Sequence, residues 1–289
     1  MQLLAYSLEE GGVEKVNVGH TWDASPIPEH YLRHCHEGYE LLYVVRGDGR
    51  YVIEGEEYIL SPQSLLLIPP HSFHYIKVNY AKEYERYVIN FQEDILPMEV
   101  KDCLNGMFAD KEQYGRFYQG DNVPSCVSQA VAALSECTQM SEEFAKCYIV
   151  SFLSAVLLRL SLNEPQLKRL MSPSLGSRVV RYLNAHLTED VSLDAVAKNF
   201  FVSKFHLCRA FKEYNGVSVL QYITEKRVMY ARHLMDRGET AVNAASKAGF
   251  GDYSSFYRAH RRICGMAPRS NKHLPVSHHT YGMKGGPLD

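Results

Sequence analysis

The stretch that decides the fold reads VSLDAVAKNFFVSKFHLCRAFKEYNG over residues 191–216 and AASKAGFGDYSSFYRAHRRICGMAP over residues 244–268. Each segment predicts a short helix, a tight turn and a second helix. In the first copy Ser192 and Ser203 can each cap a helix, and in the second Gly249-Phe250 provides the turn. A doubled helix-turn-helix pattern predicts a sequence-specific DNA-binding unit.

The second helix of each copy separates apolar from polar positions. In the first copy Phe205, Leu207, Ala210 and Phe211 are expected to face inward, which leaves the polar positions outward. Arg can pair bidentately with guanine in the major groove, and Lys, Ser and Tyr mostly hold phosphates. The alternative is a helical bundle with a solvated basic face, and the tandem arrangement favours DNA binding over it. The expected DNA-binding residues are Ser203, Lys204, His206, Arg209, Lys212, Tyr253, Ser254, Tyr257, Arg258 and Arg261.

One helix is expected between the two copies. Residues 218–236 keep Val219, Ile223, Tyr230 and Leu234 at helical spacing. Such a helix is roughly 28 Å long at its rise per residue. Successive major grooves on one face of DNA lie roughly 34 Å apart, so the helix could hold two recognition helices near adjacent grooves.

The residues of both copies that carry a resemblance to a known family are Ser203, His206-Leu207, Arg209, Phe211-Lys212, Gly216, Gln221-Tyr222, Arg227, Ala231, Leu234, Gly249-Phe250, Asp252, Ser255-Phe256, Arg258, Gly265 and Pro268. In these residues the chain resembles the AraC/XylS-type bacterial transcription regulators. The sequence departs from the family pattern at His260, where a Phe is usual, and at Ala267, where Ser commonly precedes the Pro. The resemblance implies a tandem helix-turn-helix domain with RNA polymerase as a partner.

Charge is distributed unevenly along the chain. The whole chain carries 31 Lys and Arg against 33 Asp and Glu. Residues 168–289 contain 19 Lys and Arg against 9 Asp and Glu, which leaves 12 against 24 before them. A basic C-terminal part suits the DNA polyanion, and an acidic N-terminal part indicates a separate task.

Residues 1–95 read as a β-rich domain of short strands and turns. Six strands at this spacing predict a jelly-roll barrel, so the fold class is α+β with a cupin-like barrel followed by an all-α tandem helix-turn-helix. The expected strands are Tyr39–Val45, Gly49–Ile53, Glu57–Leu60, Ser64–Ile68, His74–Val78 and Arg86–Phe91.

The remaining boundaries follow from composition. Residues 96–165 are predicted to be helical and to cover the barrel or form a homodimer, chiefly through Phe144–Leu162 with Leu153 and Leu157 in its apolar face. We expect a linker at 166–177, a DNA-binding domain at 178–273 and a disordered tail at 274–289.

Four residues of the predicted barrel share one side. His34 and His36 are two residues apart, and Glu40 keeps the same strand parity, while His74 follows one hairpin later. A His-x-His pair, a Glu and a distant His resemble the metal motif of the cupin family. The run 40–47 is similar to the sensor barrel of AraC-type regulators.

Three interpretations compete for His34, His36, Glu40 and His74. They could bind a small polar effector such as a sugar, with Trp22 or a Tyr stacking on it. They could hold a divalent metal, since three His and one Glu suit Zn, Fe, Mn or Ni. They could also be an inherited polar cluster whose members satisfy each other. The effector is the favoured interpretation, and the metal is a second one; no other cofactor is indicated.

Other function classes are disfavoured. No segment approaches the roughly 20 apolar residues of a membrane span, and residues 1–6 lack the pattern of a signal peptide, so we expect a cytoplasmic protein without a membrane partner. The seven cysteines are scattered without a C-x-x-C pair, so reduced thiols are expected. A metal-dependent cupin enzyme is the rival, but the attached basic module argues against it. The sequence therefore predicts a non-enzymatic, effector-responsive transcription regulator, and the resemblance alone suggests an activator of carbohydrate-use genes.

Overall fold

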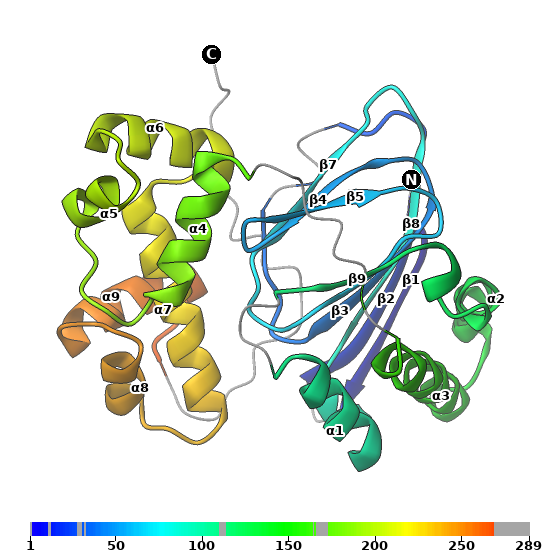
Figure 1. The fold of residues 1–289 in the computed structure, drawn as a ribbon. Helices are drawn as coiled ribbons and strands as arrows, with labels where there is room; N and C mark the ends of the chain where they lie inside the picture. The colour runs from blue at the N-terminus through cyan, green and yellow to red at the C-terminus, as the bar shows by residue number, and fades with distance from the viewer. Residues whose placement is uncertain are drawn as a thin grey trace. The chain divides into compact units, whose positions relative to one another are not determined.

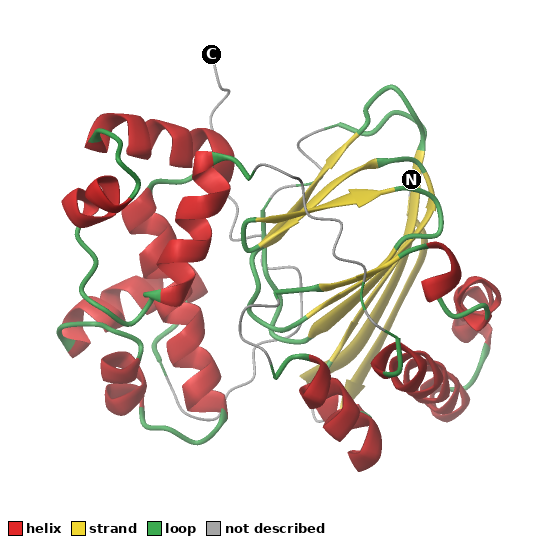
Figure 2. Ribbon diagram, in the orientation of Figure 1, coloured by secondary structure: helices red, strands yellow, loops and turns green. Residues whose placement is uncertain are grey.

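The computed structural model describes residues 2–10, 13–27, 31, 33–109, 114–163, 165 and 173–268. The chain divides into two compact units, one containing residues 1–53 and 57–170, the other residues 54–56 and 171–274. Within the described residues, the strands lie before residue 119, and the elements from residue 175 onward are helices (Figure 2). This two-domain architecture of a β-rich and a helical domain confirms the predicted fold class.

Two antiparallel sheets form the described part of the β-rich unit (Figure 1). The strands are β1 (Gln2–Glu10), β2 (Val13–Asp23), β3 (Tyr39–Arg46), β4 (Gly49–Ile53), β5 (Glu56–Leu60), β6 (Leu65–Ile68), β7 (His74–Val78), β8 (Tyr84–Phe91) and β9 (Arg116–Tyr118). The larger sheet has the order β1-β2-β8-β3-β6-β9, and the smaller one has the order β5-β4-β7.

The strands expected from sequence all exist, with ends displaced by at most two residues. The sequence missed β1 and β2, and it treated residues 96–165 as helical although β9 lies among them. Only three residues long, β9 is fixed by pairing with β6, where Phe117 lies opposite Leu66. Such a strand depends on a partner distant in sequence, so local periodicity gives little sign of it.

Strand β3 shows why the large sheet is buried on both faces. Alternate residues of a strand point to opposite faces. Leu41 and Tyr43 belong to one core cluster and Leu42 and Val44 to the other, and all four are buried. The second cluster includes residues of β4, β5 and β7, so it lies between the two sheets. Glu40 has the parity of Leu42 and is therefore placed on this interior face.

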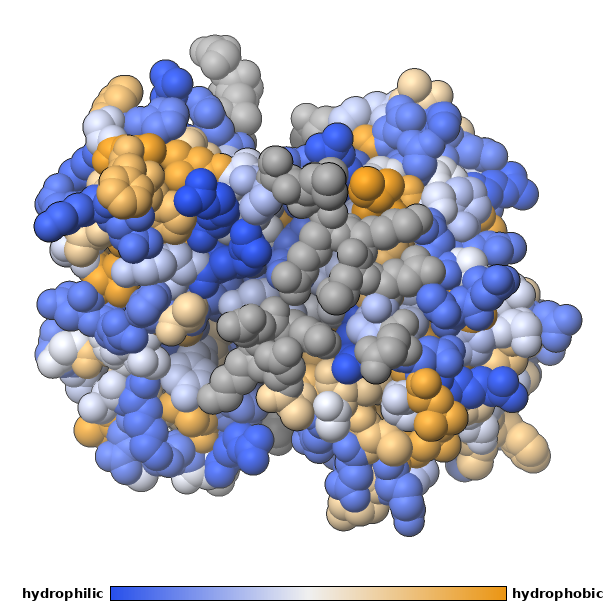
Figure 3. All heavy atoms as spheres, viewed as in Figure 1, coloured by the Kyte–Doolittle hydropathy of each residue, from blue (hydrophilic) through white to orange (hydrophobic). Residues whose placement is uncertain are grey.

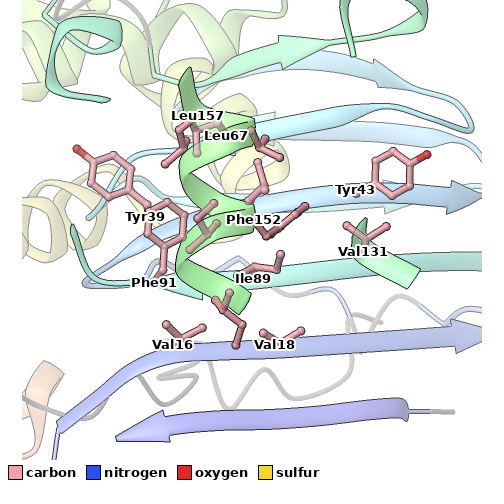
Figure 4. Packing of buried hydrophobic residues seen from close by; sticks show 14 of the residues in the cluster. Val16, Val18, Tyr39, Tyr43, Leu67, Ile89, Phe91, Val131, Phe152 and Leu157 are labelled. Atoms are coloured by element: carbon pink, nitrogen blue, oxygen red, sulfur yellow. The ribbon is translucent and has the colours of Figure 1, made fainter. Parts of the chain in front are cut away.

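Three helices, α1 (Met98–Met107), α2 (Cys126–Ala133) and α3 (Glu142–Ser161), cover the outer face of the large sheet (Figure 1). In Figure 4 Phe152 and Leu157 of α3 lie among labelled strand residues such as Ile89 and Phe91. Leu153 and Leu157, expected at a dimer contact, are fully buried in this core. They therefore cannot be the residues that meet a second copy.

By length and hydropathy α3 resembles a membrane span, with a mean hydropathy of 1.5 over an 18-residue window. This corrects the expectation that no segment approaches such a span. The feature is weak evidence for a membrane, because a core helix passes the same test. Seven of the helix residues are buried against the rest of the unit.

The helical unit contains α4 (Leu175–Ala185), α5 (Leu193–Asn199), α6 (Lys204–Asn215), α7 (Val219–Asp236), α8 (Ala241–Lys247) and α9 (Tyr253–Cys264). Every one of these helices begins after a residue whose side-chain oxygen accepts a backbone N–H three positions on, which satisfies a donor that the helix itself cannot. These N-cap residues are Ser174, Ser192, Ser203, Ser218, Thr240 and Asp252.

The boundaries of the helical unit differ from those expected at one end. Helix α4 begins at Leu175, so residues 175–177, placed in the linker by sequence, are helical. The cause is the Ser174 hydroxyl, which accepts the backbone N–H of Ser177 and starts the helix there. Residues 166–172 of the expected linker and the tail 274–289 lie outside the described residues.

Candidate functional site

The two helix-turn-helix copies, α5-α6 and α8-α9, follow the same backbone path in their turns. Phe201 has a φ of 55° and Gly249 a φ of 88°, each two residues after its first helix. The next N–H returns to a carbonyl oxygen of that helix in both copies, Val202 to Ala197 and Phe250 to Ala245, each at 3.1 Å. The duplicated pattern therefore corresponds to duplicated structure.

Burial in the second helices separates the inward from the outward face. Helix α6 buries Leu207 and Phe211, and α9 buries Phe256 and Ala259. The polar residues expected at DNA are all exposed: Ser203, Lys204, His206, Arg209, Lys212, Tyr253, Ser254, Tyr257, Arg258 and Arg261. Contact of these residues with DNA remains a prediction. Such contact requires exposed side chains, and these side chains are exposed.

Two aromatic residues, Phe205 and Tyr230, differ from expectation, and a third, Phe201, is also exposed. Phe205, expected to face inward, is 77% exposed, because it lies one turn before Arg209 and so on the outward face. Phe201 in the turn is also exposed, and Figure 3 shows apolar surface among hydrophilic spheres over α5 and α6. Tyr230 of α7, expected on its apolar face, is exposed as well.

Several of these outward side chains have protein partners that DNA could replace. Lys204 Nζ lies 2.9 Å from Asp194 Oδ2, and Arg209 Nε lies 3.5 Å from Glu213 Oε1. Arg258 Nη2 donates to Ser255 Oγ at 3.2 Å. Exposed ion pairs contribute little stability, so a phosphate or a base can compete for these cations at small cost.

In the β-rich unit, His34, His36, Glu40 and His74 come together as the sequence predicted. One ligand-type atom from each lies within 4.8 Å of the others. The ring centroids are 4.9 Å apart for His34 and His36, 4.4 Å for His34 and His74, and 5.1 Å for His36 and His74. Three of the four residues are buried.

The backbone that brings them together differs from the expected one. Glu40 lies in β3 and His74 begins β7, but His34 and His36 are outside the strands. Instead, His34 forms an isolated antiparallel bridge with His74, with N–H to O distances of 3.0 and 2.9 Å. This single bridge, together with the inward parity of Glu40, produces the convergence.

Hydrogen bonds orient the cluster. Glu40 accepts from the Tyr51 hydroxyl through Oε1 at 2.9 Å, and its Oε2 lies 2.9 Å from His36 Nε2. His74 Nδ1 lies 2.8 Å from the carbonyl oxygen of Ser72. Burial alone would raise the pKa of Glu40, but His74 and His36 outweigh it and hold that pKa well below its usual value.

Sequence reasoning missed a group beside the cluster. Arg86 of β8 is two residues from Tyr84, and its guanidinium lies 4.9 Å from the Tyr31 ring centroid and 5.4 Å from that of Tyr84. Both tyrosines belong to the core between the sheets. The alternation along β8 could have revealed it. Odd-numbered residues such as Ile89 face the helices, so the even-numbered Arg86 faces the interior between the sheets, as Tyr84 does.

Trp22, considered as a stacking residue for the effector, lies on the other side of its strand. It has the parity of Val16 and Val18 in β2, which pack toward the helices. Its indole N–H donates to Glu83 Oε2 at 2.9 Å. The tyrosine rings on the interior side of the sheet are instead those of Tyr31, Tyr51 and Tyr84.

Comparison with known proteins assigns the two units separately. Residues 23–153 match the model of an AraC-like ligand binding domain, and residues 196–272 match a helix-turn-helix domain. The chain is 26% identical over 255 residues to the HTH-type transcriptional activator RhaS of Escherichia coli, covering 84% of this chain and 86% of that protein. It is 25% identical over 240 residues to the HTH-type transcriptional regulator YbfI of Bacillus subtilis, covering 79% and 82%.

Among solved structures, ToxT of Vibrio cholerae is similar over 88% of this chain and 96% of that one, at 14% identity and a TM-score of 0.33. A DNA-bound structure of the AdpA DNA-binding domain covers 32% of this chain at 24% identity, with a TM-score of 0.31.

Proposed function

Because the chain belongs to the AraC-type transcription regulators, with an AraC-like ligand-binding domain joined to a helix-turn-helix domain, we propose that it activates carbohydrate-use genes in response to a small polar effector such as a sugar. The observation that carries the proposal is the pair of equivalent recognition helices, α6 and α9, whose outward faces carry exposed cations and hydroxyls. The similarity to a protein named as a transcriptional activator supports the sign of regulation.

DNA recognition is proposed to divide between the two copies. Arg209 and Arg258 occupy equivalent outward positions, each six residues after the N-cap residue of its helix, Ser203 or Asp252. We assign base contacts to both. Lys212 and Arg261 lie three residues further along and are assigned to phosphates. Helix α7, with 18 residues, is about 27 Å long, which suits recognition helices in adjacent grooves.

The effector is proposed to bind in the interior between the two sheets, against His34, His36, Glu40 and His74. Buried imidazoles, a carboxylate and the Arg86 guanidinium can fix polar groups, while the rings of Tyr31 and Tyr84 can pack on an apolar face. A bound effector changes DNA binding only if it binds one arrangement of the protein better than the other. None of these groups is assigned a turnover reaction, so we propose a sensor rather than an enzyme.

We further propose a cytoplasmic homodimer that contacts RNA polymerase. The support for the dimer is an exposed stripe along α3 and its C-cap residue, made of Phe144, Cys147, Ser151, Leu158 and the C-cap Leu162, spaced three, four, seven and four residues apart. This spacing places them on one side of a helix. A second copy would double the number of recognition helices on one DNA site.

The proposal is tested by selecting binding sites from random double-stranded DNA with the purified full chain. Success is an enriched sequence bound at least tenfold more tightly than a scrambled one at the same salt concentration. Effectors are then sought by thermal-shift screening against sugars, with hits tested for an altered affinity for the selected DNA. Failure to enrich any sequence would contradict the regulator's assigned recognition helices.

A further inference from the structure

We infer that the effector of the β-rich unit is a small organic acid, whose carboxylate is held by the Arg86 guanidinium and the Tyr84 hydroxyl on the interior face of the large sheet. This inference rests on the proposed function where it concerns DNA, and it names the class of effector, a carboxylate such as a sugar acid in place of a neutral sugar. Binding of the acid itself can be measured on the purified chain without DNA.

Arg86 lies in a central strand of the large sheet. Strand β8 pairs with β2 on one side and β3 on the other, and Arg86 lies opposite Thr21 and Val44. Its parity is that of Tyr84 and Val88, which pack in the core between the sheets. A charged side chain rarely occupies such a place unless it is paired. Because the two cross-strand neighbours carry no charge, they cannot neutralise the guanidinium.

The two carboxylates on the same interior face already have other partners. Asp23 of β2 accepts a hydrogen bond from the Tyr31 hydroxyl. Glu40 of β3 accepts from the Tyr51 hydroxyl at 2.9 Å through one oxygen and faces two imidazoles with the other. In the described part of the chain neither carboxylate forms an ion pair with Arg86. The guanidinium is thus a cation for which these residues supply no counter-ion.

Two buried donors meet at this point of the sheet. Arg86 Nε and the Tyr84 hydroxyl are both buried, and neither has a hydrogen-bond partner among the described residues. Burial raises the pKa of Tyr84 above its ordinary 10.0, although the nearby Arg86 cation opposes that rise, so the hydroxyl keeps its proton at neutral pH. A guanidinium can only donate, and a protonated hydroxyl can donate as well. The group that satisfies both must therefore be an acceptor.

Aromatic rings hold the guanidinium in place, and part of Arg86 can still be reached. Its Cζ lies 4.9 Å from the Tyr31 ring centroid and 5.4 Å from that of Tyr84. Contacts of this kind restrict the planar fork before a ligand arrives, so less freedom is lost on binding. Although Nε is shielded, the residue as a whole is only partly buried, which leaves part of it accessible to a small molecule.

Charge selects a carboxylate over a phosphate or a neutral group. Guanidinium binds carboxylate and phosphate alike through two parallel hydrogen bonds. A phosphate, however, would bring about two negative charges to one cation, and Glu40 is close enough for its own charge to act on Arg86. A neutral sugar would leave the cation without a counter-ion. A carboxylate brings the one charge that the guanidinium lacks.

The rest of the effector is expected to carry hydroxyl groups. Asn90 lies four residues after Arg86 on the same face of β8, opposite Glu40. It is 2% exposed, and its Oδ1 has no hydrogen-bond partner among the described residues. A hydroxyl can donate to this oxygen, so a hydroxylated acid satisfies the acceptor as well as the two donors.

The test follows the side-chain Nε–H resonance of Arg86 by NMR and the heat of binding by calorimetry, both with the full chain. The probes are gluconate, glucuronate and galacturonate, compared with glucose, galactose and inorganic phosphate at constant ionic strength. At least one acid should shift the Nε–H resonance saturably. It should bind at least about tenfold more tightly than its neutral counterpart, because charge-assisted hydrogen bonds are about twice as strong as neutral ones.

The variants are Arg86→Met, Tyr84→Phe and the control Arg46→Met, in which the lost guanidinium is exposed and paired with Glu83 and Glu85. Arg86→Met should remove the advantage of the acid without lowering the melting temperature, because an apolar side chain replaces an uncompensated charge. Tyr84→Phe should weaken acid binding by about tenfold, as for loss of a hydrogen bond to a charged group. Arg46→Met should bind like the parent.

Three results would overturn the inference. One is the absence of a saturable Nε–H shift with every acid; another is equal binding of acids and neutral sugars. The third is acid binding unchanged in Tyr84→Phe, which keeps the cation and decides the case if Arg86→Met fails to fold. Phosphate bound more tightly than every carboxylate would overturn the choice of a carboxylate. Selected DNA bound normally by a chain that binds no acid would leave the regulator intact, whereas acid bound through Arg86 without any change in DNA affinity would confirm the site and contradict its effector role.

Discussion

Gly176 and Tyr214 pack so closely that a β-carbon on residue 176 would lie 2.3 Å from the Tyr214 Cβ and 2.6 Å from its Cγ. The Ala210 carbonyl oxygen would be 3.1 Å away. Gly176 is on α4, and the other two residues are on α6, the proposed recognition helix of the first copy. Absence of a side chain at Gly176 therefore sets how closely α6 rests on α4.

We predict that Gly176→Ala destabilises the helical unit by about 1–3 kcal/mol, as overpacking does, and weakens binding to selected DNA. The measurement is thermal unfolding followed by circular dichroism, with DNA affinity by fluorescence anisotropy. Gly106→Ala is the matched control, because a β-carbon there meets nothing within 4 Å. On α1 it should stabilise by about 0.5–1 kcal/mol, the usual advantage of Ala over Gly in a helix. Equal effects of the two substitutions would refute the packing argument.

The exposed faces of α6 and α9 give the second prediction. Arg209→Ala should cost about 1–3 kcal/mol of binding and relax the preference at one base pair. Lys212→Ala should weaken all sequences alike and reduce the slope of log affinity against log salt by about 1. Arg237, exposed just after α7, is the control, and its Ala variant should bind like the parent. Equal losses for Arg209→Ala on selected and random DNA would assign this residue to phosphate instead.

The sequence could predict what depends on local periodicity and capping. Ser192 and Ser203 were each placed from sequence at the helix start where the structure has them. His34 and His36 were grouped with Glu40 by spacing, and the side chains converge. The sequence could not predict which backbone contact brings them together, because the bridge between His34 and His74 joins segments forty residues apart.

Orientation was the harder part to predict. Helix α3 has apolar residues around much of its circumference, so sequence could not decide whether Leu153 or Leu158 faces the sheet. Packing decides it: Leu153 is fully buried and Leu158 is 40% exposed. Arg86 was missed for a related reason, because a charged residue in a strand is ordinarily assigned to the solvent side. In this barrel it faces the interior beside two tyrosines.

The exposed stripe of α3 gives the third prediction. If two copies meet along it, Leu158→Lys with Leu162→Lys should yield a soluble monomer by light scattering, with dimer affinity lowered at least tenfold. Leu153→Lys should instead unfold the β-rich unit, because it buries a charge without a partner. A folded, monomeric Leu153→Lys protein would show that the wrong face had been assigned.

Cys147 offers an independent check of the same interface. It is exposed on α3 between Phe144 and Ser151. A short bifunctional maleimide should cross-link two copies through Cys147, and Cys147→Ser should abolish the cross-link while leaving light scattering unchanged. Cross-linking that persists in Cys147→Ser, or a parent that is monomeric at micromolar concentration, would contradict the dimer.

The last prediction concerns His260, which stands where related sequences usually have Phe. The residue is 3% exposed, its Nδ1 lies 3.0 Å from the Met266 carbonyl oxygen, and its ring meets Phe256 edge-on at 5.5 Å. Burial lowers the pKa of His260 from its ordinary 6.5, the Met266 hydrogen bond opposes that effect, and the nearby Arg232 adds to it. Protonation therefore favours the unfolded chain.

It follows that the contribution of a neutral His260 is fully present above pH 6.5 and is lost as the pH falls through the lowered pKa of the folded state. The substitution His260→Phe removes the titrating group, so the variant does not lose this stability at low pH. At pH 7 the variant should differ little from the parent, because the hydrogen bond that is lost, worth about 0.5–1.5 kcal/mol, is offset by added apolar burial. Near pH 5 the variant should melt at the higher temperature. Circular dichroism measures the melting, and fluorescence of Trp22, the chain's one tryptophan, reports the β-rich unit as an internal control. If the difference between parent and variant were the same at pH 5 and pH 7, His260 would not titrate on unfolding in this range.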